Sequence, residues 1–251
     1  MKVLLVNGSS RKNGCTGTAL KEIERSLKEE GVDTQIHFIG NQALPDCIAC
    51  RKCRELGKCI FDDQVNEFTQ QAKQCDGFVF GSPVYFAHPS ARLLTFMDRA
   101  FYSNGGAFAF KPAAAVLSAR RAGTTASFDV INKYFTICSM PVVSSTYWNH
   151  IYGQQPEEAA EDKEGLMTMY TLSLQGRRSE GIKYASCCVA LIPCTPGTCR
   201  FCALYLAQIL CLLTLETSNG ENFFIFKADE EGVPGSTLIE DNAENEEIIP
   251  F

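Results

Sequence analysis

The sequence lacks a long apolar run at its N-terminus and has little histidine. Only four residues, all apolar, separate Lys2 from Asn7. This is too short for the core of a secretory signal peptide, so we expect a cytoplasmic protein. The three histidines form neither an H-x-x-x-H pattern nor a Ser-His-Asp pattern. We therefore expect His37, His88 and His150 to be structural or solvent-facing residues.

Positive charge is not in excess. The formal net charge is −6, and residues 228–251 contain eight acidic residues and no lysine or arginine. Without those acids the remaining chain would have a net charge of +2, so it lacks the basic surface that nucleic-acid binding requires. We expect no nucleic-acid partner, and we expect residues 228–251 to form an acidic, disordered tail.

No apolar run reaches the length of a membrane-spanning helix. The strongest candidate, residues 202–215, has 14 residues, of which only Gln208 and Thr214 are polar. Because a membrane span needs roughly 20 residues, we expect no membrane helix and no membrane partner.

Cysteine, by contrast, is abundant. The chain has 13 cysteines, of which four lie in residues 47–59 and six lie in residues 187–211. Disulfides are not the default explanation in a chain without a secretory signal. The close spacing of the first group suggests metal or cluster chemistry instead.

Strand and helix patterns alternate along residues 1–172. Short apolar runs predict five buried strands, at residues 2–6, 34–38, 78–80, 113–117 and 141–145. Apolar residues at helical spacing predict five helices, at residues 16–30, 62–73, 90–101, 128–135 and 157–172. Strands with little polar alternation are buried on both faces. The pattern therefore predicts a doubly wound α/β fold, in which two layers of helices enclose a five-stranded parallel sheet.

The pattern changes after Leu172. We interpret residues 1–172 as one domain, residues 173–227 as a Cys-rich apolar segment whose pattern defines no fold, and residues 228–251 as the acidic tail. A fusion and a change of reading frame would both produce such an atypical C-terminal extension.

The loop Gly8–Thr16 joins the first strand to the first helix. Ligands of doubly wound sheets bind outside the carboxyl ends of the strands. The hydroxyl groups, the glycines and the helix N-terminus could hold a phosphate, and Arg11 could add charge-assisted hydrogen bonds. The loop has neither a P-loop nor a G-x-G-x-x-G pattern, which argues against a dinucleotide site. The alternative is a polar loop that only turns the chain.

Two more loops follow strands at the same edge of the predicted sheet. Residues 81–86 (GSPVYF) could lie along a flat ring system, although Tyr85 and Phe86 could equally belong to the core. Residues 118–125 (SARRAGTT) carry arginines and hydroxyl groups. The alternative to a ligand-binding role for residues 118–125 is a solvated basic loop.

A series of separated motifs occurs in order along residues 1–172. They are Met1–Ser9 (MKVLLVNGS), Arg11–Gly14 (RKNG) with Thr16, Gly81–Tyr85 (GSPVY), Phe96–Arg99 (FMDR), Lys111–Ala115 (KPAAA), Ser118–Thr124 (SARRAGT) and Pro141–Ser144 (PVVS). Together they resemble the NAD(P)H-dependent FMN reductase family, and especially its iron–sulfur flavoprotein branch. The resemblance implies a flavodoxin-like fold with strand order 2-1-3-4-5 and an FMN cofactor.

The resemblance also implies roles for residues of the three loops. The FMN phosphate would be held by Ser9, Arg11, Asn13, Gly14, Cys15 and Thr16. Cys15 stands where relatives commonly have asparagine, so we expect it to contact the phosphate through its backbone. The isoalloxazine ring would be flanked by Pro83, Val84, Tyr85, Phe86, Ser118, Arg120, Arg121, Gly123 and Thr124. An arginine beside the ring would stabilise the negative charge of reduced flavin.

The first group of cysteines has the spacing C-x2-C-x2-C-x5-C and consists of Cys47, Cys50, Cys53 and Cys59. Four thiolates this close together suit a [4Fe–4S] cluster, and the spacing resembles the compact motif of iron–sulfur flavoproteins. A zinc site, which more often pairs two C-x2-C units across a longer spacer, and free or redox-active thiols are the alternatives. The second group, within residues 187–211, receives no role.

The leading interpretation is an oxidoreductase. NAD(P)H would reduce FMN, and reduced FMN would pass electrons, with or without a [4Fe–4S] cluster, to a quinone, a flavin or another small-molecule or protein acceptor. Because the flavin performs the chemistry, we expect no catalytic side chain. The alternatives are an electron-transfer iron–sulfur flavoprotein that does not use nicotinamide directly, and a non-enzymatic redox sensor. We expect a homodimer or homotetramer.

Overall fold

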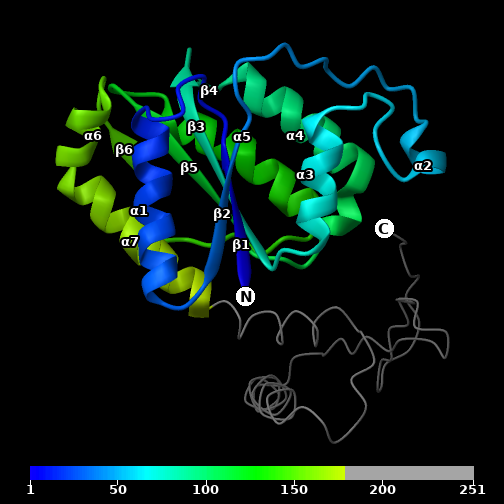
Figure 1. The fold of residues 1–251 in the computed structure, drawn as a ribbon. Coiled ribbons are helices and arrows are strands. Elements are labelled where there is room, and N and C mark those ends of the chain that lie inside the picture. Colours follow the sequence, from blue (N-terminus) through cyan, green and yellow to red (C-terminus); the bar gives the residue numbers. More distant parts are fainter. Residues whose placement is uncertain (179–251) are drawn as a thin grey trace, which may run out of the picture. The chain divides into compact units, whose positions relative to one another are not determined.

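The structure is a computed structural model that describes residues 1–178. Its sheet has the strand order β2-β1-β3-β5-β6 (Figure 1). The five strands, all parallel, are β1 (Lys2–Asn7), β2 (Asp33–Phe38), β3 (Gly77–Tyr85), β5 (Ala113–Ala119) and β6 (His150–Tyr152). A short strand, β4 (His88–Pro89), pairs antiparallel with the end of β3. The predicted flavodoxin-like α/β fold and its order of parallel strands are confirmed.

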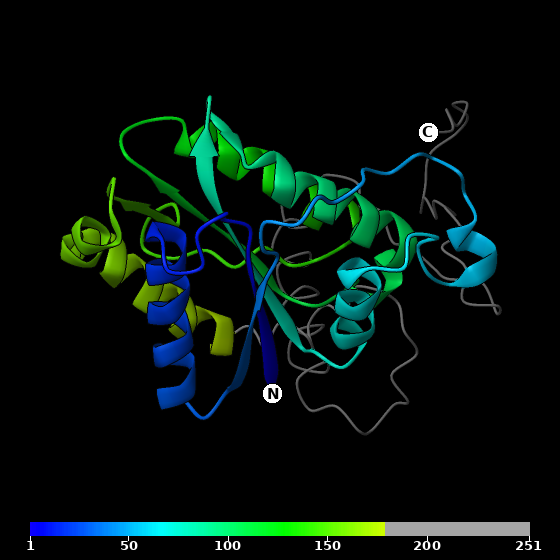
Figure 2. The same ribbon diagram turned by 45° about the horizontal axis from the view of Figure 1, so that its top comes forward.

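Helices cover both faces of the sheet (Figures 1 and 2). One layer consists of α1 (Cys15–Glu29), α6 (Pro156–Glu161) and α7 (Lys163–Arg178), and the other of α3 (Gln64–Lys73), α4 (Ala91–Asn104) and α5 (Thr124–Ile137). A 3-10 turn, η1 (Gly105–Ala107), follows α4. The one-turn helix α2 (Cys53–Leu56) lies apart from both layers, on the long connection between β2 and α3.

The core beneath α3, α4 and α5 is aromatic. Its fully buried aromatic rings are those of Phe68, Phe78, Phe80, Phe96, Phe108 and Phe135. The ring centroids of Phe68 and Phe96 are 4.8 Å apart, which joins α3 to α4, and those of Phe78 and Phe108 are 5.1 Å apart. Burying one such ring contributes about 1.5–3 kcal/mol. These rings hold α3 and α4, which carry the residues around the cysteine loop described below, against the sheet.

The fifth strand was expected at residues 141–145, and this position is wrong. Only one bridge, between Ala113 and Val142, forms there, and the strand itself is β6 (His150–Tyr152), paired with Leu117–Ala119. The chain advances from residue 142 to residue 150 while β5 advances only from residue 113 to residue 117. The extra residues cannot stay in register, so they leave the sheet between the two pairings.

The last helix, expected as one segment at residues 157–172, is divided at Asp162. The Asp162 carboxylate accepts hydrogen bonds from Gly165 N (2.9 Å) and Tyr152 N (2.7 Å), and therefore caps a new helix, α7. This helix continues to Arg178, past the expected end at Leu172. Ser173 is buried, and its hydroxyl group lies 3.1 Å from Met169 O in its own helix and 3.4 Å from Ile23 O in α1.

Several expectations concern residues outside the described part of the chain. They are the Cys-rich segment from residue 179 to residue 227, the acidic tail 228–251 and the apolar run 202–215. Within residues 1–178, no helix combines the length and the apolarity that a membrane span requires.

Candidate functional site

The three loops singled out in the sequence meet at the carboxyl edge of the sheet. Gly8 N donates to Gly81 O at 2.9 Å, which joins the first loop to β3. Thr16 and Ser118 share a buried hydrogen bond of 2.7 Å between their hydroxyl groups, which joins the first loop to the third. An added Cβ at Gly81 would lie 2.9 Å from Thr16 Cγ2, so only glycine permits this close approach.

The first loop is shaped by its own polar groups. The Asn7 side chain accepts from Ser9 N (3.0 Å) and donates to Lys12 O (3.1 Å), while Ser9 Oγ accepts from Arg11 N (3.1 Å). The following helix, α1, begins at Cys15 after the N-cap residue Gly14, which supplies no capping side chain, and it has no acidic residue in its first turn. The loop therefore presents uncapped helix amides, which favour an anion.

Three predicted residues of this loop differ in what their side chains do. Arg11 is exposed to solvent. Asn13 is also exposed and accepts a hydrogen bond from Lys21 Nζ at 3.0 Å. The Cys15 thiol donates to Gly153 O at 3.4 Å, and burial raises its pKa. Because its thiol faces Gly153, Cys15 can offer the loop only its backbone amide.

The second predicted loop, residues 81–86, is largely strand. β3 continues through Pro83 and Val84 to Tyr85 and then turns into β4. The two turn residues, Phe86 and Ala87, have φ angles of 51° and 60°, the left-handed backbone of a type I′ hairpin. The Phe86 side chain is fully exposed at the tip and Tyr85 is also exposed, so the alternative that these two residues belong to the core is wrong.

The third loop packs against this hairpin. Gly123 has a φ of +89°, and a Cβ at this position would lie 2.7 Å from Ala87 Cα. α5 begins at Thr124, earlier than the expected start at residue 128, and the Thr124 hydroxyl group shares a hydrogen bond of 3.2 Å with Tyr152 Oη. Arg120 and Arg121 are exposed to solvent at the edge of the site.

A buried histidine lies on β6, the strand beside the third loop. His150 is 5% exposed and packs against the rings of Phe128, Trp148 and Tyr152. Its Nε2 has no hydrogen-bond partner among the described residues, and burial lowers its pKa to about 4. His150 is therefore neutral at physiological pH.

The four cysteines of the first group lie on the connection between β2 and α3. Cys47 and Cys50 are exposed, whereas Cys53 and Cys59 are partly buried. All four line one open hollow of about 330 Å³. In the part of the chain that the structure describes, however, no three Cys, His, Asp or Glu side chains converge as metal ligands would.

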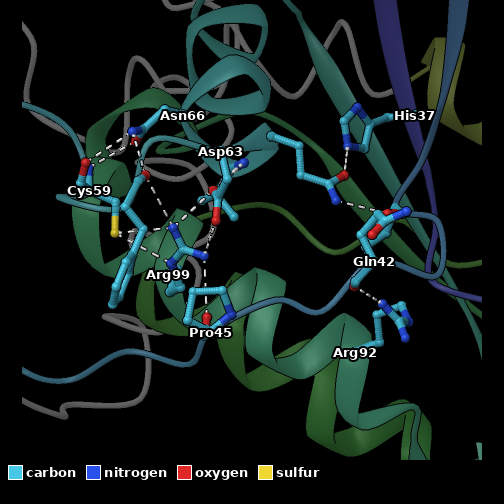
Figure 3. A network of polar contacts seen from close by, with 12 residues as sticks. His37, Gln42, Pro45, Cys59, Asp63, Asn66, Arg92 and Arg99 are labelled. Carbon is cyan, nitrogen blue, oxygen red and sulfur yellow. Dashed lines mark hydrogen bonds and ion pairs between the residues drawn. The ribbon is translucent and has the colours of Figure 1, made fainter.

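A buried arginine, Arg99, is among the residues that line this hollow, and Figure 3 shows its polar partners. The Arg99 side chain is inaccessible to solvent, and its guanidinium forms two hydrogen bonds with the Asp63 carboxylate, of 2.7 and 2.9 Å. It also donates to Pro45 O at 3.2 Å. Burial lowers the pKa of Arg99, but the hydrogen bonds to Asp63 and Cys59 outweigh this effect and raise it. Arg99 is therefore a permanent buried cation.

Sequence reasoning missed the residues that support both sites. Asn7 shapes the first loop, Asn66 and Arg99 hold Cys59, and Asp63 pairs with Arg99. For Arg99 a signal was present: it lies three residues after Phe96, on the apolar face of α4. A charged residue at a buried helix position indicates a fixed partner.

Comparisons with known proteins agree with this geometry. The family model described as NADPH-dependent FMN reductase matches residues 1–154. An iron–sulfur flavoprotein of Methanocaldococcus jannaschii is 34% identical over 181 residues, covering 68% of this chain and 93% of the relative. One from Methanosarcina thermophila is 29% identical over 173 residues, covering 67% and 90%. Among solved structures, an NADH:FMN oxidoreductase has a TM-score of 0.55 at 14% identity, covering 71% and 89%.

The fold and the three converging loops define a flavodoxin-like protein. The chain belongs to the NADPH-dependent FMN reductase family, in its iron–sulfur flavoprotein branch. It is therefore an FMN-binding redox protein.

Proposed function

We propose that this protein is an FMN-dependent oxidoreductase that takes electrons from NAD(P)H and delivers them to a quinone, a flavin or another small-molecule or protein acceptor. The observation that carries the proposal is the convergence of three polar and aromatic loops at the carboxyl edge of the sheet. FMN supplies the redox chemistry, so the protein has to bind, orient and shield the ring. We also propose that the protein assembles as a homodimer or homotetramer.

The phosphate of FMN would bind at the first loop. The start of α1, which lacks a capping side chain, offers amides, and exposed Arg11 offers a charged partner. Ser9 and Thr16 would act through hydroxyl groups that the loop already orients. Asn13 and Gly14 would complete the loop, and Cys15 would contribute its backbone amide. A single phosphate cradle without a separate adenine site favours FMN over FAD.

The isoalloxazine ring would lie between the β3–β4 hairpin and the third loop. Pro83, Val84, Tyr85 and Phe86 would form one side of the ring site, and Ser118, Arg120, Arg121, Gly123 and Thr124 the other. The close contact between Gly123 and Ala87 holds these two sides together. The two exposed arginines can approach the pyrimidine edge, where negative charge develops on reduction.

The cysteine loop would hold a [4Fe–4S] cluster. Four thiols line one hollow, and an all-thiol donor set suits this cluster. Since the thiols do not converge in the described chain, the loop would close around the cluster as it is built. Changing Cys53 to Ala should abolish iron binding but keep FMN, because the flavin loops follow other strands. Stoichiometric zinc, or no iron after anaerobic reconstitution, would eliminate the cluster.

A second candidate function is an electron carrier that does not use nicotinamide directly. The hollow lined by four cysteines favours it, because a cluster passes single electrons to protein partners. One experiment separates the two functions: anaerobic protein is mixed with NADH or NADPH, and the flavin absorbance is followed. Rapid bleaching supports the oxidoreductase. Bleaching only by a reduced protein donor supports the carrier. In a separate assay, the flavin is released by heat and identified, and recovery of FAD rather than FMN would refute the cofactor assignment.

A further inference from the structure

Cys59 is held more firmly than the other cysteines of its group. Asn66 Oδ1 accepts from Cys59 N at 2.9 Å, and Asn66 Nδ2 donates to Cys59 O at 3.0 Å. Arg99 Nε and Nη2 each donate to Cys59 Sγ at 3.4 Å (Figure 3). Cys59 is therefore fixed through both its backbone and its sulfur atom.

The rest of the cysteine loop has a different character. Cys50 lies between Ala49 and Arg51, whose φ angles of 52° and 59° are unfavourable for residues with a side chain. Cys47 and Cys50 are exposed. The loop thus offers one oriented thiol, that of Cys59, and two exposed thiols, those of Cys47 and Cys50, the second of which lies in a strained segment.

The guanidinium of Arg99 cannot easily turn away from Cys59. Both Asp63 oxygens accept from it, at 2.7 and 2.9 Å, and its carbon lies 4.9 Å from the centre of the Phe61 ring. The planar fork of an arginine fixes the direction of its remaining N–H groups once one side is bound. The Asp63 carboxylate therefore orients the remaining N–H groups of Arg99 towards the sulfur atom of Cys59.

We propose that Arg99 is a positioning residue for the cluster: it orients Cys59 as the first ligand and raises the reduction potential of the cluster. This inference rests on the proposed function. A [4Fe–4S] cluster held by the four cysteines would accept one electron from reduced FMN, which would thereby be oxidised by one electron, with no bond broken and no proton transferred at Cys59 or Arg99. Hydrogen bonds and positive charge at a ligand sulfur stabilise the more negative reduced state.

The test compares a paired variant with a matched control. Asp63→Asn combined with Arg99→Gln replaces the ion pair by two amides, so no buried charge is left alone. The control is Arg92→Gln, on the same helix, because Arg92 donates to Gln42 O (2.6 Å) in the segment that leads to the cysteines. Each full-length protein is reconstituted anaerobically with iron and sulfide. Iron and FMN per chain are measured, and the cluster is titrated by electron paramagnetic resonance.

We expect the paired variant to retain FMN, to bind less iron and to show a lower potential in the cluster that forms, while Arg92→Gln matches the wild type. Loss of all iron from a folded, FMN-loaded variant also supports the positioning role. If the pair does not fold, Arg99→Lys, which keeps the charge but not the fork, should show a lower cluster potential than the wild type. An unchanged potential overturns the inference alone, whereas wild-type protein without iron overturns the cluster proposal as well.

Discussion

Thr16 and Ser118 are 102 positions apart in the sequence, yet their hydroxyl groups lie 2.7 Å apart. Both residues are buried. Their hydrogen bond therefore holds two loops of the protein together before any ligand binds. Arg11, a few residues earlier, is exposed. Arg11 and Thr16 should therefore respond differently to substitution, although both are proposed to bind the FMN phosphate.

Arg11→Ala should weaken FMN binding and leave the free energy of unfolding unchanged. A charge-assisted hydrogen bond contributes roughly 1.5–3 kcal/mol, which corresponds to an increase in Kd of about 10- to 150-fold. Thr16→Ala should weaken binding and also destabilise the apoprotein by about 1 kcal/mol. Titration of apoprotein with FMN and denaturant unfolding measure both effects. Lys12→Ala removes the same charge from the next exposed position and is the control; equal affinity in Arg11→Ala and wild type would place the phosphate elsewhere.

The buried imidazole of His150 predicts a loss of stability in mild acid. Its folded pKa of about 4 lies below the ordinary value of 6.5, so the unfolded chain binds a proton that the folded chain refuses. The free energy of unfolding should therefore fall as the pH falls from 6.5 towards 4, by up to roughly 3 kcal/mol. Burial also lowers the pKa of His37 and acts in the same direction.

The measurement is the midpoint of thermal unfolding as a function of pH. His150→Leu should flatten the decrease between pH 6.5 and 4, whereas the same change at exposed His88 should not. A decrease of equal size in His150→Leu and wild type would mean that this imidazole titrates normally.

At the scale of elements, the β3–β4 hairpin combines backbone strain with exposure. Phe86 and Ala87 occupy left-handed backbone, where Asn-Gly is strongly preferred. Changing them to Asn and Gly should stabilise the protein by about 1 kcal/mol or more, and should weaken FMN binding because the aromatic tip is lost. Phe110, also exposed at a φ of 61° on the opposite edge of the sheet, is the matched control. Phe110→Asn should raise stability without changing FMN affinity, and retained affinity in the hairpin variant would remove Phe86 from the ring site.

At the scale of the whole molecule, the flavin loops and the C-terminal region are far apart in sequence. All proposed FMN residues precede residue 130, so a chain ending at residue 180 should bind FMN as the full chain does. A chain ending at Leu172 should be less stable by at least about 1 kcal/mol, because it lacks the buried Ser173, whose hydroxyl group has acceptors at Met169 O and Ile23 O. Flavin content and thermal unfolding of the two shortened chains test this. Failure of a folded chain of 180 residues to hold FMN would assign residues 181–251 a part in the site.

The sequence by itself determined the class of fold and the edge where the site lies. Short apolar runs followed by glycine and hydroxyl residues record which segments are buried and where the chain turns, and both are local properties. For this reason the parallel α/β fold, the three loops and the position of the cysteine loop after β2 could all be predicted, whereas the order of the strands was implied by the resemblance to a known family. Even the exposed Arg11 could be singled out from its neighbours alone.

The tertiary structure decided which residues meet. The strand expected at residues 141–145 is at His150–Tyr152, because the position of a strand depends on the residues of β5 with which it pairs. A run of apolar residues does not specify this pairing register. Likewise, the hydrogen bond to Asp63 orients the Arg99 guanidinium towards Cys59, and these residues come from separate segments. Hydrogen bonds between distant segments form only when packing brings them together, so their partners cannot be found from local pattern.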